Sequence, residues 1–212
     1  DKMKAELTKA FIERYGAGTE EIMMIASPAR INIIGEHIDY NGGKVFPAAI
    51  DRYLYVLLRK RADTTIIYDD IRFPGALEFS STETFYYRRE NQYANYLNGM
   101  LAMLQKGGYK LTSGFEVLFF SKLPAGGGIS SSAALEVGFG RAVAELFGFK
   151  VDAVTLAKMG QESEHVFMNM QCGIMDQFAS VFGKENLNNV KIVTSSNVIT
   201  SNFSSTDSNF EK

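Results

Sequence analysis

The sequence has no tryptophan and a single cysteine, Cys172, among its 212 residues. One cysteine cannot form a disulfide within the chain, and such sparse cysteine use is typical of proteins from a reducing compartment. No apolar run approaches the roughly 20 residues that a membrane-spanning helix needs, and no charged-then-apolar leader opens the chain. We therefore expect a cytoplasmic protein that does not enter a membrane.

The chain also lacks an excess of charge of either sign. Its net charge is −2 at pH 7, so it carries no electrostatic footprint for nucleic acid or for an anionic membrane surface. Hydrophobic residues make up 46% of the sequence, which is enough for one compact core. The composition thus predicts a globular protein that binds neither nucleic acid nor a membrane.

Apolar periodicity divides the chain into an early part rich in strands and a later part rich in helices. Strands are predicted at residues 22–26, 30–34, 45–50, 53–59, 64–68, 77–79 and 115–120, with a break at Pro28. Helices are predicted at residues 2–15, 91–106, 152–168 and 174–182, and from the serines at 130–132 to residue 147. This arrangement predicts an α+β fold and argues against strict alternation of strands and helices.

The composition changes at residue 186. Asparagine, serine and threonine fill 15 of the last 27 positions, and only residues 190–193 resemble a strand. Such a segment has too little apolar surface to bury against a core. We predict one domain over residues 1–185 and a divergent, partly disordered tail over residues 186–212.

A glycine-rich loop follows the apolar strand at residues 115–120. Three glycines at 126–128 let the backbone approach a ligand closely, and three serines at 130–132 begin the next helix. Free N–H groups and the helix dipole favour an anion at such a helix start, and a serine hydroxyl can ligate Mg²⁺ held by phosphates. The loop predicts a phosphate-binding site. The alternative is an ordinary glycine turn, because no Walker-type lysine follows.

Two further polar clusters have both a functional and an ordinary interpretation. Glu36, His37 and Asp39 follow a strand in a glycine-flanked turn, where they could accept hydrogen bonds from sugar hydroxyls or simply be solvated. Asp176 lies at the apolar start of a helix. It is either a surface residue that favours the helix dipole or a buried carboxylate, for which Arg30 is the obvious partner.

Together these segments resemble one enzyme family. Residues 27–41 are similar to the N-terminal signature of galactokinases. Residues 124–136 are similar to the ATP motif of the wider family of galacto-, homoserine, mevalonate and phosphomevalonate kinases, and residues 172–180 to the segment that holds the galactokinase catalytic aspartate. The resemblance runs from about residue 5 to 185. It implies a mixed β-sheet packed with helices, as in the N-terminal domain of that family, and phosphorylation of galactose at C1 by ATP.

The resemblance also implies a role for individual residues. Asp176 would be the general base that takes the proton of the C1 hydroxyl, and Arg30 would keep this aspartate ionised. The residues implied to hold the sugar are Glu36, His37, Asp39 and Gly173. Those implied to bind the phosphates of ATP are Gly126, Gly127, Gly128, Ile129, Ser130, Ser131 and Ser132. Ser132 and Glu164 would ligate Mg²⁺, although Glu164 could equally be a plain surface carboxylate on its helix.

Some features depart from the family pattern. Ala29 and Ile38 stand where galactokinases usually have glycine and threonine, and galactokinases are roughly twice as long as this chain. The implied partners are galactose and ATP, together with a missing C-terminal half or a second copy of the chain. The main prediction is a galactokinase that is weakly active or inactive alone. The alternatives are a non-catalytic galactose- or nucleotide-binding fragment or sensor, and a kinase for a related sugar such as an aminosugar.

Overall fold

The computed structural model describes residues 2–34, 46–121, 131–182, 189–193 and 198–202. The chain begins with helix α1 (Lys2–Tyr15), as its apolar spacing predicts, and Leu7 and Phe11 form the buried stripe. The helix ends at Gly16, whose φ of +81° lies in the left-handed region that favours glycine after a helix. Its N–H donates to the carbonyl of Ile12 at 2.8 Å.

A mixed sheet of five strands forms the centre of the domain. The strands are β1 (Met23–Ile34), β2 (Phe46–Lys60), β3 (Thr65–Asp70), β4 (Leu77–Ser80) and β5 (Phe115–Ser121). Their order is β1-β2-β5-β3-β4, with β3 and β5 parallel and the other neighbours antiparallel. The predicted α+β architecture with a mixed sheet is confirmed.

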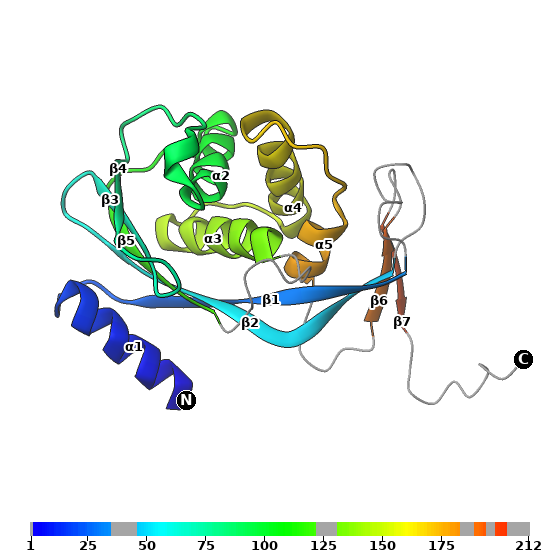
Figure 1. Ribbon diagram of the computed structural model, residues 1–212, viewed down its shortest axis with the longest axis horizontal. Coiled ribbons are helices and arrows are strands. Elements are labelled where there is room, and N and C mark those ends of the chain that lie inside the picture. Colours follow the sequence, from blue (N-terminus) through cyan, green and yellow to red (C-terminus); the bar gives the residue numbers. More distant parts are fainter. Residues whose placement is uncertain (1, 35–45, 122–130, 183–188, 194–197, 203–212) are drawn as a thin grey trace, which may run out of the picture.

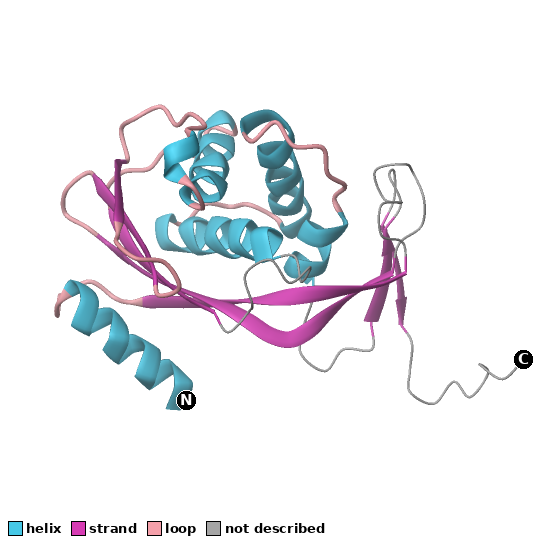
Figure 2. Cartoon of the chain, viewed as in Figure 1, coloured by secondary structure: helices cyan, strands magenta, loops and turns pink. Residues whose placement is uncertain are grey.

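Four helices cover one face of this sheet, and α1 lies against the other (Figures 1 and 2). The four are α2 (Ala94–Lys106), α3 (Ser131–Phe147), α4 (Ala153–Glu162) and α5 (Met175–Phe182). A short 3₁₀ helix, η2 (Arg89–Asn91), precedes α2, and a π-helical turn, η3 (Ser163–Phe167), follows α4.

Alternate residues of the central strands contribute to two cores. Val56 and Leu58 of β2 pack beneath the four helices, whereas Leu57 packs against α1 together with Leu118 of β5. Side chains that alternate between the two faces of a strand produce this division. Because both faces are covered, the middle of each central strand is an unbroken apolar run, residues 53–58 in β2 and 117–120 in β5, as is usual for buried strands.

The first two strands are longer than the sequence predicts. Pro28 does not end β1, because β1 is an edge strand of the five-stranded sheet, where a missing N–H can fall on the side without a neighbour. Instead of ending the strand, Pro28 is followed by a shift in the pairing register of β1 with β2, between Pro28 and Arg30. Likewise β2 continues through residues 51–52, so that the segments predicted at 45–50 and 53–59 are one strand paired antiparallel with β1.

Two predictions near the C-terminus also need correction. The helix predicted over 152–168 is α-helical only to Glu162 and then widens into η3. Beyond residue 186, a second strand, β7 (Val198–Asn202), pairs antiparallel with β6 (Asn189–Val193), whereas the sequence predicts only the first. The division into a domain over 1–185 and a tail over 186–212 stays a prediction. Across the described segments, no helix combines the length and the apolar character needed to cross a bilayer.

Candidate active site

The predicted site lies partly outside the described residues. The described residues do not include Glu36, His37 and Asp39, nor the loop 126–130. For Arg30 in β1 and Ser131 at the start of α3, the structure describes the backbone but not the side chain. The site is therefore built from the start of α3, from η3 and from α5.

Helix α3 begins at the second of the three serines that the sequence places at a helix start. The first turn of any α-helix has N–H groups without main-chain partners, and this start follows directly on the predicted phosphate-binding loop. Ser27 of β1 holds the helix in place, because its hydroxyl donates to the carbonyl of Ala134 at 2.8 Å. Gly138 permits the close contact, since a Cβ there would lie 2.6 Å from the Cβ of Ser27. The start of α3 is thus fixed against the strand that carries Arg30.

Glu164 is a buried carboxylate, with 5% of its surface exposed, and the alternative of a plain surface residue is wrong. It lies in η3, where the N–H of Met168 donates to the carbonyl of Ser163 at 2.9 Å, one residue further along the chain than in an α-helix. Isolated π-helical turns are frequent at functional sites. The wider turn ends α4 and places Glu164 inside the helical layer.

Glu136 is a second buried carboxylate, and it is not among the site residues predicted from the sequence. It is fully buried on α3, four residues after Ser132 and hence on the same side of the helix. Burial raises its pKa well above the usual range, and the neighbouring Glu164 raises it further through its charge and a hydrogen bond. The side-chain amide of Gln177 donates to Glu136 Oε2 at 3.4 Å. The four-residue spacing from Ser132 is the signal that could have identified Glu136.

Asp176 lies in the first turn of α5, half-buried and beside Gln177. Its charge also raises the pKa of Glu136, so the two carboxylates lie within electrostatic range of each other. The pKa of the Cys172 thiol is raised, first by burial, then by a hydrogen bond with Glu164 and by the charges of Glu164, Glu136 and Asp176. The structure therefore brings together three carboxylates from α3, η3 and α5, with Gly173 in the loop between the last two.

The donor atoms of this cluster suit Mg²⁺. A serine hydroxyl and a carboxylate are hard oxygen ligands, and Ser132 and Glu164 supply one of each. Glu136 Oε1 is buried without a hydrogen-bond partner in the described part of the chain, and a nearby cation would offset the accumulated negative charge. Among the described residues, no group of three or more Asp, Glu, His or Cys side chains could hold a metal ion by itself. Mg²⁺ commonly takes only one or two protein ligands and completes its shell with phosphate and water.

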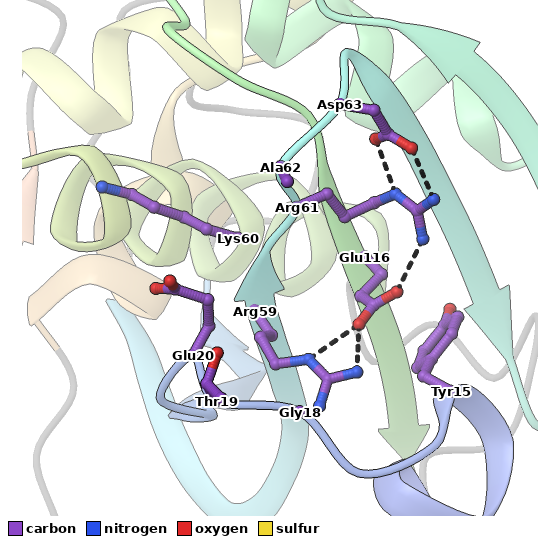
Figure 3. Close-up of a pocket in the computed structure, with 10 residues that line it drawn as sticks. All are labelled: Tyr15, Gly18, Thr19, Glu20, Arg59, Lys60, Arg61, Ala62, Asp63 and Glu116. Atoms are coloured by element: carbon purple, nitrogen blue, oxygen red, sulfur yellow. Dashed lines mark hydrogen bonds and ion pairs between the residues drawn. The ribbon is translucent and has the colours of Figure 1, made fainter.

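A hollow of about 510 Å³ lies away from this cluster, between the end of α1 and the turn after β2 (Figure 3). Arg59 donates to Glu116 Oε1 at 2.8 Å through Nε, and Arg61 donates to Glu116 Oε2 at 3.0 Å. Arg61 also makes a forked pair with Asp63. Since both guanidinium groups are engaged by carboxylates, the network ties β2 to β5 and offers no free cation to a ligand.

Two family models match the chain. The galactokinase galactose-binding signature matches residues 9–60, and the N-terminal domain of GHMP kinases matches residues 95–184. The matched segments include β1, β2 and the whole helical layer up to α5. In fold and in these matches, the chain is similar to the N-terminal domain of GHMP kinases.

Within that family the chain is similar to galactokinases. It is 41% identical over 186 residues to the galactokinase of Clostridium beijerinckii, a match that covers 87% of this chain and 46% of the relative. For the galactokinase of Bacillus subtilis the identity is 38% over 184 residues, with 86% and 47% covered. The crystal structure of Lactococcus lactis galactokinase complexed with galactose superposes with a TM-score of 0.87 at 36% identity, covering 94% of this chain and 51% of that one.

A more distant structure supports the fold alone. The mevalonate kinase of Methanococcus jannaschii superposes with a TM-score of 0.70 at 18% identity, covering 88% of this chain and 56% of that one. In all of these comparisons the chain spans about half the length of the protein it matches.

Proposed function

We propose that this chain carries the galactose- and ATP-binding residues of a galactokinase, which transfers the γ-phosphoryl group of ATP to the C1 hydroxyl of galactose. The observation that carries the proposal is the convergence of Glu164, Glu136 and Asp176 behind the start of α3. The match of residues 9–60 to the galactose-binding signature supports the choice of sugar. The cytoplasm, where ATP is available, is the proposed location.

Asp176 acts on the acceptor sugar in this proposal. Its carboxylate accepts the proton of the C1 hydroxyl while the C1 oxygen bonds to the γ-phosphorus and the bond from that phosphorus to ADP breaks. Arg30 is proposed to pair with this carboxylate and to stabilise its negative charge. The sugar would be held by Glu36, His37, Asp39 and Gly173.

Residues 126–132 bind the phosphates of ATP in this proposal. Backbone N–H groups of the glycine loop and of the start of α3 donate to phosphate oxygens, and the helix dipole favours their charge. Ser132 and Glu164 would hold Mg²⁺, which supplies neutralisation of the charge on the phosphates when it is bound. Positioning and electrostatic stabilisation of this kind account for most of the catalysis of phosphoryl transfer.

Low turnover of the 212-residue chain alone is part of the proposal. The chain spans about half the length of the galactokinases it matches. Holding two substrates in line is worth up to about 7–11 kcal/mol, and an incomplete cleft loses part of this while admitting water. The same observation favours a second candidate, a fragment that binds galactose or nucleotide without turnover. A C-terminal half or a second copy of the chain remains the proposed protein partner.

A steady-state assay of the purified chain with galactose and Mg²⁺·ATP tests the function. We expect galactose-dependent release of ADP at less than the usual kinase rates of about 1–100 s⁻¹. The matched variant Asp176→Asn keeps the size of the side chain and removes the proton acceptor, so it should abolish this release. ADP release that does not depend on galactose, or that persists in Asp176→Asn, contradicts the proposal. Galactose binding without ADP release would favour the second candidate.

A further inference from the structure

The loop over residues 168–174 joins η3 to α5 and belongs to neither helix (Figure 1). Gly173, which is proposed to hold the sugar, lies in this loop, and Asp176 follows in the first turn of α5. A segment outside regular secondary structure needs other hydrogen bonds to fix its backbone. The position of the proposed sugar contact therefore depends on what holds this loop.

Main-chain hydrogen bonds from η3 hold the first half of the loop. The N–H of Met168 donates to the carbonyl of Ser163, and the N–H of Met170 donates to the carbonyl of Glu164 at 2.7 Å. Between them, Asn169 has a φ of +53°, a left-handed conformation that asparagine adopts more readily than most residues. The carbonyl groups of η3 thus fix the loop as far as residue 170.

The second half of the loop is held by a side chain of η3, the ring of His165. Its Nε2 lies 2.6 Å from the carbonyl oxygen of Cys172 and 3.3 Å from the nitrogen of the same residue. A carbonyl oxygen can only accept, so the shorter contact requires the ring to donate, which assigns a proton to Nε2. The longer contact is then a close approach, because a nitrogen that donates this proton has no lone pair left to accept with.

This hydrogen bond fixes the orientation of one particular peptide unit. The carbonyl of Cys172 and the N–H of Gly173 belong to the same unit, which is planar and trans, so the two groups point in opposite directions. A carbonyl directed at His165 therefore directs the Gly173 N–H away from that ring. No described residue accepts a hydrogen bond from this N–H. Since glycine has no side chain, Gly173 can contact a sugar only through its backbone.

We propose that His165 is a positioning residue, which orients the peptide unit between Cys172 and Gly173 so that the Gly173 N–H donates to a hydroxyl group of the sugar. This inference rests on the proposed function. His165 is exposed, and a hydrogen bond that water can replace contributes little to the stability of a fold. Its effect is therefore expected in the affinity for the sugar, whereas an ordinary solvated histidine would have no such effect.

The test is calorimetric titration of the 212-residue chain and its variants with galactose. His165→Leu removes the donor, so it should weaken the affinity for galactose by about 3- to 10-fold, as expected for the loss of one hydrogen bond. The side-chain amide of His165→Gln can still donate to the Cys172 carbonyl, so this variant should stay within about twofold of the parent chain. The affinity for Mg²⁺·ATP should be the same in all three, which a general loosening of the turn that carries Glu164 would not produce.

Gln171→Leu is the matched control. Gln171 is also exposed and precedes Cys172 in the same loop, but the contact with η3 does not use its side chain. Its substitution places the same apolar side chain on the surface and should leave both affinities unchanged. A ¹⁵N spectrum of the imidazole ring in the parent chain gives a second measurement that needs no ligand. On the neutral ring it should show the proton on Nε2.

The outcomes separate the inference from the proposed function. If the parent chain binds galactose and His165→Leu binds it equally well, the inference is wrong and the sugar site stands. A loss in His165→Gln as large as in His165→Leu, a parallel loss of affinity for Mg²⁺·ATP, or a neutral ring without a proton on Nε2 also overturns the inference. If the parent chain binds no galactose, the proposed sugar site and the inference are both wrong.

Discussion

Two buried glutamates of this chain have opposite surroundings. Glu116 lies between the guanidinium groups of Arg59 and Arg61, whereas Glu164 lies beside Glu136, with Asp176 close to that carboxylate. A buried carboxylate that is paired with cations contributes to structure. One that adjoins other carboxylates is retained against its electrostatic cost, and this is a common mark of functional sites. The contrast supports the assignment of Glu164, and not Glu116, to the proposed site.

The sugar-binding residues give the first prediction. Asp39→Ala removes a proposed acceptor of a galactose hydroxyl, so galactose should raise the melting temperature of the parent chain but not that of the variant. Thermal unfolding with and without galactose measures this. The two chains should melt together when no sugar is present. An equal rise with galactose in both would remove Asp39 from the proposed site.

At the scale of single elements, the cap of α4 can be tested directly. Asp152 accepts from the N–H of Thr155 at 2.8 Å and from its hydroxyl at 2.8 Å, and these hydrogen bonds lower the pKa of the carboxyl group. Asp152→Ala should therefore lower the melting temperature, whereas Asp152→Asn, an equally good cap, should retain it.

The pH dependence of this cap has a definite sign. A carboxyl group whose pKa is lowered by folding stabilises the protein above its usual pKa and loses that effect as the pH falls through the lowered value. The difference between the parent chain and Asp152→Ala should thus be full at neutral pH and shrink in acid. A difference that grows on acidification would contradict the cap.

The contact between α2 and η3 gives a second test at this scale. Gly99→Ala would place a Cβ 2.1 Å from Ser163 Oγ and 3.2 Å from the Phe167 ring, and overpacking of this kind costs about 1–3 kcal/mol. Ser163→Ala removes the offending oxygen, which has no hydrogen-bond partner in the described chain. Urea unfolding of the two single variants and the double variant should show partial rescue. Strict additivity would mean that the two residues do not touch.

At the scale of the whole molecule, the Arg59–Glu116–Arg61 network and the proposed site lie at opposite ends of β5. Glu116 is the second residue of this strand, whereas Ser121, its last residue, pairs with Leu54, which in turn pairs with Ser27 beside the start of α3. Five residues of strand span about 17 Å. Glu116→Ala leaves the buried Arg59 without a carboxylate partner and Arg61 with Asp63 alone, and it should reduce the free energy of unfolding by about 3–5 kcal/mol.

Ligand affinity should distinguish Glu116→Ala from substitutions in the proposed site. At a temperature where Glu116→Ala remains folded, its affinities for galactose and for Mg²⁺·ATP should equal those of the parent chain. Chemical denaturation measures the stability, and calorimetry measures the affinities. A loss of affinity in the folded variant would show that the network is coupled to the site.

The sequence by itself determined the features that depend on neighbouring residues. Apolar spacing identified α1, α2 and α3, the helix start predicted at Asp152 coincides with the cap of α4, and three serines after three glycines identified the start of α3. Each of these signals acts within a few residues of the chain, so it survives without knowledge of the fold.

Only the tertiary structure decided which distant residues meet. The insertion of β5 between β2 and β3 and the continuity of β1 through Pro28 depend on pairing with strands far away in the chain. The burial of Glu136 and Gln177, and of Glu164 in a π-helical turn, depends on helices that approach one another at Gly99 and Gly160. Whether a carboxylate is buried, and which charges surround it, depends on how helices and strands pack together. The sequence around a single carboxylate therefore shows neither property.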